Sequence, residues 1–273
     1  MGTDKRIRQK ANRELARKAR IRREKMGKAR RRGLIFGIGI PLIVAALFGV
    51  SQLQDGPSTS SDTSFDVVIT NPPQTLETLP GEKITGDTPC PKADGTQKRT
   101  TVFEKAPKLC IDPAKTYTAT FDTSEGKIEV SLNTKTTPNT VNNFVVLSRY
   151  KFYDTSYIFR TDTTLDIIQG GGATNTDGPN YTIKDEGTGF KYSEGDLVMA
   201  RSPGPDSGGS QFFFVTGPKA SVLDGPGTYV TFGKITKGLE IAQAIIGLSS
   251  GSGELGGAPA VPVKINSVTI NEK

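Results

Sequence analysis

The sequence predicts a mainly β domain, a closed barrel of six to eight short strands with helices over its open ends, preceded by a single N-terminal transmembrane helix. Two observations predict the barrel. The chain of 273 residues contains 31 Gly and 17 Pro, which favours turn-rich β structure over a helical bundle. Its C-terminal part alternates apolar and polar residues in short runs and has only two helix-like segments. A third observation, an apolar run near the N-terminus, predicts the spanning helix.

Charge is distributed unequally along the chain. Residues 1–32 hold 15 of the 35 Lys and Arg and only three acidic residues, a net charge of +12. The other 241 residues hold 20 basic and 25 acidic side chains, a net charge of −5. A nucleic-acid-binding surface is therefore restricted to the tail, and since the tail has no interleaved aromatic residues we expect no nucleic-acid partner. The basic tail is predicted to be cytoplasmic and suited to contact anionic lipid.

The apolar run extends from Gly33 to Val50, and no charged residue follows before Asp55. About 20 helical residues cross the hydrocarbon core of a bilayer, so we predict a transmembrane signal anchor over residues 33–53. A cleaved signal peptide is the alternative, but its positive region would be unusually long and no clean A-x-A site ends the run. The positive-inside rule predicts a single-pass protein of the cytoplasmic membrane, with its C-terminal domain outside.

The segment after the anchor is polar. Residues 54–89 are rich in Ser, Thr, Asp, Gly and Pro, which predicts a flexible linker. Cys90 and Cys110 are the only cysteines. In an oxidising compartment such a pair indicates a disulfide, with two free thiols as the alternative. Residues 90–113 are thus predicted to be a disulfide-closed lead-in to the domain, residues 114–273.

Within the domain, the pattern predicts a hairpin, two helices and a final strand, at residues 117–132, 141–148, 239–246 and 263–270. Thr137 and Pro138 are suitable residues for the start of the first helix. The whole chain lacks His, which excludes Ser-His-Asp and Cys-His catalysis and His metal ligation. Two cysteines cannot form a four-thiolate zinc site. We therefore predict no metal and no cofactor.

Four segments carry more specific motifs: Thr137-Pro-Asn-Thr-Val-Asn-Asn-Phe144, Phe159-Arg160 with Ile168-Gln-Gly-Gly171, Gly209-Ser-Gln-Phe-Phe213, and Leu223-Asp-Gly225 with Val230-Thr-Phe-Gly-Lys-Ile235. In this order and at these intervals they resemble the cyclophilin family of peptidyl-prolyl cis-trans isomerases. The resemblance implies a closed eight-stranded antiparallel barrel capped by two helices. It says nothing about residues 1–113.

The resemblance also implies roles for single residues. Arg160 corresponds to the catalytic arginine, which donates toward the prolyl nitrogen lone pair and so favours the deconjugated, pyramidal nitrogen. Rotation of an Xaa-Pro bond must cross a barrier of about 18–20 kcal/mol but needs no proton transfer, so a chain without His can catalyse it. The substrate-binding positions implied are Gln169, Ile167, Met199, Ala200, Gln211, Phe213, Leu223 and Tyr229.

The chain departs from the family pattern around the expected site. The loop after Arg160 is one residue longer than usual, and either Leu165 or Asp166 stands near the place of a family Phe. Arg201 stands where Asn is usual. Asp162 and Asp166 are placed to pair with Arg160 or Arg201, which would weaken the donor.

From these observations we predict a bacterial, membrane-anchored prolyl isomerase that assists the folding of secreted or envelope proteins. Its partners would be Xaa-Pro segments of unfolded or extracytoplasmic proteins. Two alternatives belong to other classes. One is a catalytically weak module that binds Pro-containing segments as a chaperone or scaffold. The other is a purely structural envelope protein.

Overall fold

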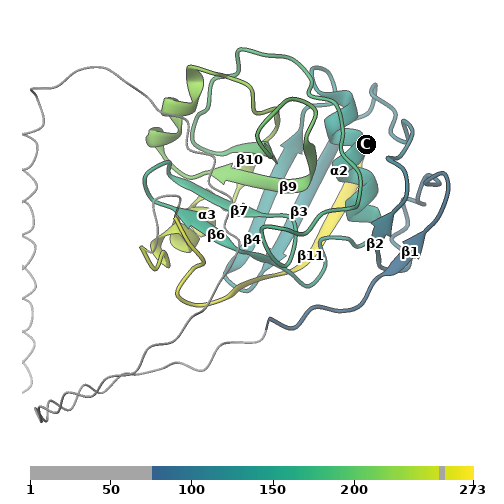
Figure 1. Cartoon of the computed structure of the whole chain (residues 1–273), viewed down its shortest axis with the longest axis horizontal. Helices are drawn as coiled ribbons and strands as arrows, with labels where there is room; N and C mark the ends of the chain where they lie inside the picture. Colours follow the sequence, from purple (N-terminus) through teal and green to yellow (C-terminus); the bar gives the residue numbers. More distant parts are fainter. Residues whose placement is uncertain (1–75, 252–255) are drawn as a thin grey trace, which may run out of the picture. The chain divides into compact units, whose positions relative to one another are not determined.

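The computed structural model describes residues 76–251 and 256–273, and the mainly β prediction is confirmed there. Nine strands form one antiparallel sheet in the order β5-β11-β3-β4-β10-β8-β9-β7-β6 (Figure 1). They are β3 (Tyr117–Thr123), β4 (Gly126–Leu132), β5 (Ser156–Ile158), β6 (Arg160–Asp162), β7 (Ile167–Gly170), β8 (Asp196–Arg201), β9 (Gly208–Val215), β10 (Thr231–Lys237) and β11 (Val263–Glu272).

The sheet curls into a nearly closed barrel because its two end strands are consecutive in the chain. β5 pairs with β11 and β6 pairs with β7, and only Phe159 separates β5 from β6. Two backbone hydrogen bonds bridge the gap, from the Tyr157 N–H to the Gly172 carbonyl (3.2 Å) and from the Phe159 N–H to the Gln169 carbonyl (3.0 Å). The sheet has nine strands where eight were predicted, because this continuous segment bends at Phe159 to pair on both sides.

Both predicted helices are confirmed as α2 (Pro138–Arg149) and α3 (Leu239–Gly247), which lie at opposite sides of the barrel (Figure 1). A 3-10 helix, η1 (Pro218–Asp224), was not predicted. The Glu186 carboxylate accepts hydrogen bonds from the backbone N–H groups of Asn139 (2.9 Å) and Thr140 (2.6 Å). These are N–H groups of the first helical turn that have no partner inside the helix, so an acidic side chain stabilises the start of α2.

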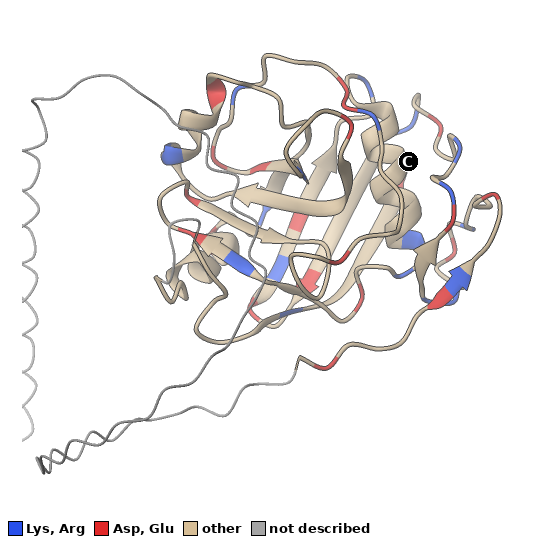
Figure 2. Ribbon diagram, viewed as in Figure 1, with Lys and Arg blue, Asp and Glu red and all other residues tan. Residues whose placement is uncertain are grey.

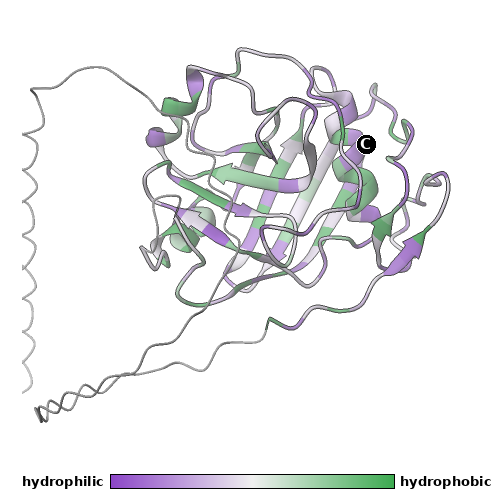
Figure 3. Ribbon diagram, viewed as in Figure 1, coloured by the Kyte–Doolittle hydropathy of each residue, from purple (hydrophilic) through white to green (hydrophobic). Residues whose placement is uncertain are grey.

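The barrel core is rich in aromatic rings. Phe144 of α2 lies with its ring centroid 5.7 Å from Phe121, 6.3 Å from Phe212 and 5.3 Å from Phe232. All four rings are at most 1% exposed. Figure 3 shows the apolar residues gathered on the strands and helices, while charged residues of both signs are scattered over the domain in Figure 2. The helix therefore packs on β9, one of the strands that carry the expected site.

The lead-in is closed by its own disulfide and is attached to the domain by hydrogen bonds and by packing. Cys90 and Cys110 form a disulfide with their Cα atoms 5.3 Å apart, as predicted. The Asn142 side chain of α2 accepts from the N–H groups of Cys110 (2.7 Å) and Ile111 (3.2 Å) and donates to the Lys108 carbonyl (2.9 Å). Ile111 is buried in the barrel core. The lead-in thus packs on the domain rather than merely preceding it.

Part of the predicted linker is ordered. Residues 82–84 form strand β1 (Glu82–Ile84), which pairs in parallel with β2 (Thr100–Phe103). Residues that read as linker in the sequence thus have a partner strand, residues 100–103, inside the loop that the disulfide closes. The predicted tail, the anchor at 33–53 and the linker as far as residue 75 lie outside the described residues. No helix within residues 76–251 or 256–273 has the length and apolarity to cross a bilayer.

Replacement of both cysteines by serine is expected to lower the free energy of unfolding by about 3 kcal/mol, because the sulfur bridge restricts a loop of this length in the unfolded chain. The loop joins residues 20 apart in sequence. Urea denaturation of the two proteins measures the difference, with reduced wild-type protein as the matched control. Equal midpoints for the bridged and unbridged proteins would contradict this expectation.

Candidate functional site

A row of polar side chains crosses three neighbouring strands. Arg160 of β6 lies opposite Gln169 of β7, and β7 pairs in turn with β9, which carries Gln211. Arg160 Nη1 donates to Gln169 Oε1 (2.9 Å), and Gln169 Nε2 donates to Gln211 Oε1 (3.0 Å). Gln211 Nε2 then donates to the backbone carbonyls of Asn175 (2.9 Å) and Asp177 (3.0 Å). The row fixes both amide orientations and brings together three of the predicted site residues.

Arg160 also forms an ion pair on its own strand. Its Nη2 donates to Asp162 Oδ2 at 2.7 Å, and the side chains of the two residues are 25% and 1% exposed. Residues two apart share a face of a strand, which explains how they meet. Asp162 Oδ1 accepts from the Thr164 N–H (2.9 Å), the Thr164 hydroxyl (2.6 Å) and the Leu165 N–H (3.2 Å). The carboxylate is therefore fixed on one side by the following turn and holds the guanidinium on the other.

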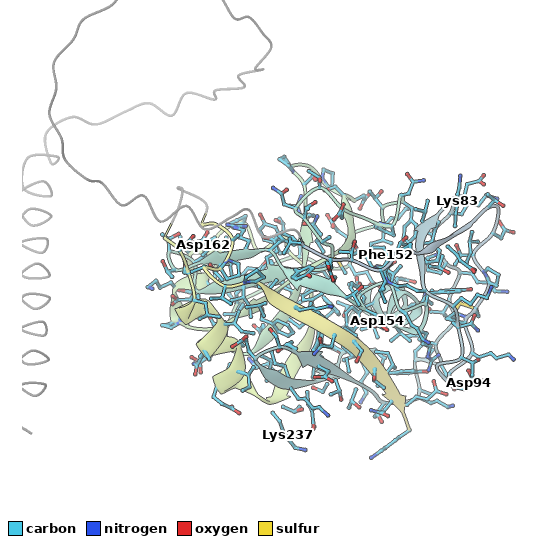
Figure 4. The ribbon with its side chains drawn as sticks, turned by 90° about the horizontal axis from the view of Figure 1, so that it is seen from below. Lys83, Asp94, Phe152, Asp154, Asp162 and Lys237 are labelled. Carbon is cyan, nitrogen blue, oxygen red and sulfur yellow. A yellow bond between two sulfur atoms is a disulfide. The ribbon has the colours of Figure 1, made fainter. Side chains whose placement is uncertain are left out.

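The sequence allowed two acidic partners for the arginines, and the structure selects one. Asp162 pairs with Arg160, whereas Asp166 pairs with Lys219 Nζ at 2.7 Å. The expectation that Asp166 pairs with an arginine of the site is therefore wrong, because the chain turns at this residue and directs its side chain toward η1. Figure 4 shows Asp162 and Asp94 of the lead-in on opposite sides of the described part of the chain.

The environment of Asp162 predicts an acid-sensitive contribution to stability. Burial alone would raise the pKa of this carboxyl, but hydrogen bonds from Thr164 and Arg160 outweigh burial and lower the pKa below its ordinary value of 3.8. A lowered folded-state pKa stabilises the protein above the unfolded-state value, and this stabilisation is lost as the pH falls through the folded-state value.

We therefore expect the difference in unfolding free energy between wild type and Asp162→Asn to be constant above about pH 5 and to shrink below pH 3.8. Urea titrations of both proteins from pH 3 to pH 7 measure it. A difference independent of pH would show that the Asp162 carboxylate makes no charge-dependent contribution.

An apolar cluster apart from the barrel core, which we call the apolar wall, consists of Ile167, Tyr192, Val198, Ala200, Phe213, Val215 and Ala220, with Leu165, Phe190, Leu223 and Tyr229 packed against them. Five of these residues were predicted: Ile167, Ala200, Phe213, Leu223 and Tyr229. The rings of Phe213 and Tyr229 meet edge to face at 5.8 Å. Leu165 packs against the same cluster, so it is Leu165, not Asp166, that supplies the apolar side chain at this place. Phe213 is 3% exposed and Ile167 is 2% exposed, which leaves the less buried members to face an incoming group.

Met199 lies elsewhere. Its side chain is buried in the barrel core, whereas its neighbours on β8, Val198 and Ala200, belong to the apolar wall. Successive side chains of a strand point to opposite faces, so Met199 and Ala200 cannot both reach the site. The structure therefore places Met199 apart from the site that Ala200 lines, and Val198 is a wall residue that the same alternation would have indicated. Tyr192 and Ala220 also belong to the wall, and nothing in the sequence distinguished them.

A cleft of about 1330 Å³ lies over the polar row. Arg160, Gln169, Ala200 and Gln211 line it, together with Arg201 and parts of the loops around residues 173–182 and 256–259. Ile167, Phe213, Leu223 and Tyr229 do not line this cleft, but Ala200 belongs both to the cleft and to the apolar wall. Ala200 is therefore the residue at which the apolar wall meets the cleft that Arg160 lines.

The strand that carries Arg160 is also covered at its outer edge. Thr161 and Gly257 exchange two backbone hydrogen bonds, of 2.7 and 3.1 Å. This bridge pairs an edge that would otherwise be open to solvent and adds to the fixation of Arg160. Within residues 76–251 and 256–273, no cluster of three or more His, Cys, Asp and Glu side chains is placed to hold a metal ion.

Comparison with known proteins gives a consistent set of relatives. The family model "Cyclophilin type peptidyl-prolyl cis-trans isomerase/CLD" matches residues 118–270. Peptidyl-prolyl cis-trans isomerase B of Bacillus subtilis is 41% identical over 121 residues, which cover 43% of this chain and 81% of that protein. Peptidyl-prolyl cis-trans isomerase B of Escherichia coli is 32% identical over 164 residues, 56% of this chain and 99% of that protein. A solved cyclophilin-type isomerase from Cryptosporidium parvum has a TM-score of 0.49 and 27% identity, and the match covers 58% of this chain and 99% of that one.

Proposed function

This chain belongs to the cyclophilin-type peptidyl-prolyl cis-trans isomerase family, and from that premise we propose that it works outside the cytoplasmic membrane, on an N-terminal anchor, as a folding catalyst for secreted or envelope proteins. We assign the reaction to this site because Arg160 is held in a fixed position between Gln169 and Asp162, beside the apolar wall. Slow Xaa-Pro isomerisation limits the folding of many chains, which gives such a catalyst its use.

The reaction that we assign to the site needs only a positioned substrate and a positively charged hydrogen-bond donor. The apolar wall receives the proline ring, and Gln169 and Gln211 offer polar atoms to the substrate backbone. An N–H of Arg160 then donates toward the prolyl nitrogen as its lone pair leaves conjugation with the carbonyl. Each tenfold acceleration requires about 1.4 kcal/mol of preferential stabilisation of this twisted state. A guanidinium held by partners on two sides has little reorganisation to undergo during the reaction.

A second candidate function is a proline-binding module with weak turnover. The ion pair between Arg160 and Asp162 favours it, because a neighbouring carboxylate reduces the net positive charge available to the prolyl nitrogen. Turnover and binding distinguish the two functions.

We expect the full-length chain in detergent to raise the cis-trans exchange rate of an Ala-Pro peptide, measured by NMR exchange spectroscopy. Line broadening from peptide binding without faster exchange would overturn the catalytic function in favour of the module.

Three sequence features support the outward location. They are the basic residues 1–32, the apolar residues 33–50 and the disulfide of the lead-in, which is a bond typical of oxidising compartments. The test is protease digestion of spheroplasts from a bacterium that expresses the chain with a C-terminal epitope tag. We expect loss of the tag in intact spheroplasts. Protection of the tag until the membrane is lysed would overturn the outward location.

A further inference from the structure

Arg201, at the end of β8, lines the same cleft as Arg160. Its guanidinium carbon lies 5.3 Å from the ring centroid of Tyr229. Nη2 donates to the Thr228 hydroxyl at 2.7 Å, and Nη1 donates to the Gly204 carbonyl. A second guanidinium is therefore held at the wall of the cleft by a cation–π contact and two hydrogen bonds.

The charge of Arg201 is not neutralised as that of Arg160 is. None of the ion pairs in the described part of the chain includes Arg201, and both of its acceptors are neutral oxygens. Its Nε is buried without a hydrogen-bond partner. The other charged residue that lines the cleft is Asp177, whose Oδ2 accepts from the Thr174 N–H at 2.7 Å. Each Nη carries two N–H groups, so each retains one beyond the bond already made.

The aromatic ring beneath Arg201 is itself fixed. Tyr229 packs on Phe213 at 5.8 Å. Its N–H donates to the Tyr192 hydroxyl at 2.8 Å, and that hydroxyl donates to the Tyr229 carbonyl at 2.9 Å. Because the ring and the two acceptors position the guanidinium before any ligand arrives, a ligand anion meets a planar donor with little remaining conformational entropy to lose.

We propose that Arg201 is a specificity-determining residue, which forms a subsite for an acidic side chain within two residues of the substrate proline. This inference rests on the isomerase function of the cleft. A carboxylate accepts the remaining Nη hydrogens of Arg201, in the charge-assisted geometry that guanidinium groups favour. If Arg201 instead only covers Tyr229, the enzyme has no preference between acidic and neutral neighbours of proline.

The experiment uses the full-length chain in detergent and Ala-rich peptides with a single proline. Glu and Gln are compared at each of the two positions before and the two positions after proline, and kcat/KM is measured by NMR exchange spectroscopy at low salt. We expect a Glu-to-Gln ratio of roughly fivefold at one position at least, which is the scale of a partly exposed ion pair. The ratio should approach one in Arg201→Gln, remain partly in Arg201→Lys, and fall with added NaCl.

Ratios near one at all four positions in the wild type would overturn the proposal, whether or not the variants fold. A ratio that survives in Arg201→Gln would overturn it as well, because another group would then recognise the acid. Turnover of the Gln peptides reports the isomerase function separately, so loss of the preference and loss of catalysis are distinguishable.

Discussion

Replacement of Arg160 by alanine is expected to lower kcat/KM about 100- to 1000-fold, the effect of removing one preorganised donor from an electrostatic catalytic site. The guanidinium bridges Gln169 and Asp162, and no other cation on β6 or β7 can take its place. Lysine at this position should restore little, because a single ammonium cannot keep the forked contacts. NMR exchange with an Ala-Pro peptide measures the loss.

Stability must be separated from catalysis in this experiment. Alanine at position 160 leaves the carboxylate of Asp162, which is 1% exposed, without its guanidinium, and an unpaired buried charge is destabilising. The double variant Arg160→Ala/Asp162→Asn removes that charge and should be the more stable of the two, yet equally inactive. Lys237→Ala, whose side chain is exposed on β10, is the control for loss of a positive charge. Recovery of turnover in the double variant would show that Arg160 serves folding rather than chemistry.

Truncation of Phe144 to alanine is expected to lower the free energy of unfolding by about 3–5 kcal/mol, the range for a large ring removed from a well-packed core. The ring is fully buried against Phe121, Phe212 and Phe232, so the cavity cannot collapse without moving three strands. Phe212 precedes Phe213 of the apolar wall on β9. We therefore also expect a higher KM for proline peptides in the folded fraction. Urea denaturation followed by circular dichroism measures the stability.

The matched variant is Phe144→Leu, which keeps most of the volume and should cost much less. Val261→Ala, at a residue that is 55% exposed, should change the free energy of unfolding by no more than about 0.5 kcal/mol. A loss for Phe144→Ala no larger than that for Val261→Ala would mean that this ring cluster does not stabilise the barrel.

Much of the fold follows from local pattern. The period-two alternation of the hairpin, the proline at the start of α2 and the apolar spacing of α3 are properties of neighbouring residues, and each element formed close to where the sequence predicts it. The disulfide is also predicted from composition, because the chain has only two cysteines to pair. Strand β1 is different, since it pairs with β2, a strand further along the chain that local pattern does not identify as its partner.

The site was predicted in its residue types and only partly in its contacts. The motifs indicated Arg160, Gln169 and Gln211, and the register of β6, β7 and β9 brings these side chains into one row. The same motifs suggested both Met199 and Ala200, although neighbours on one strand face opposite sides. The motifs therefore indicated where in the chain the site lies. The alternation of side chains along β8 decided that Ala200, and not Met199, lines it.

The sequence by itself determined that the chain has no histidine, and its motifs predicted one arginine, Arg160, as the catalytic residue. Only the tertiary structure decided which charges meet. Asp162 shares a strand face with Arg160, Asp166 turns away to Lys219, and Arg201 lies over Tyr229 without an acidic partner among the residues described. The physical reason is that ion pairs form over a few ångströms, and those distances are set by strand register, turns and packing between residues far apart in the chain.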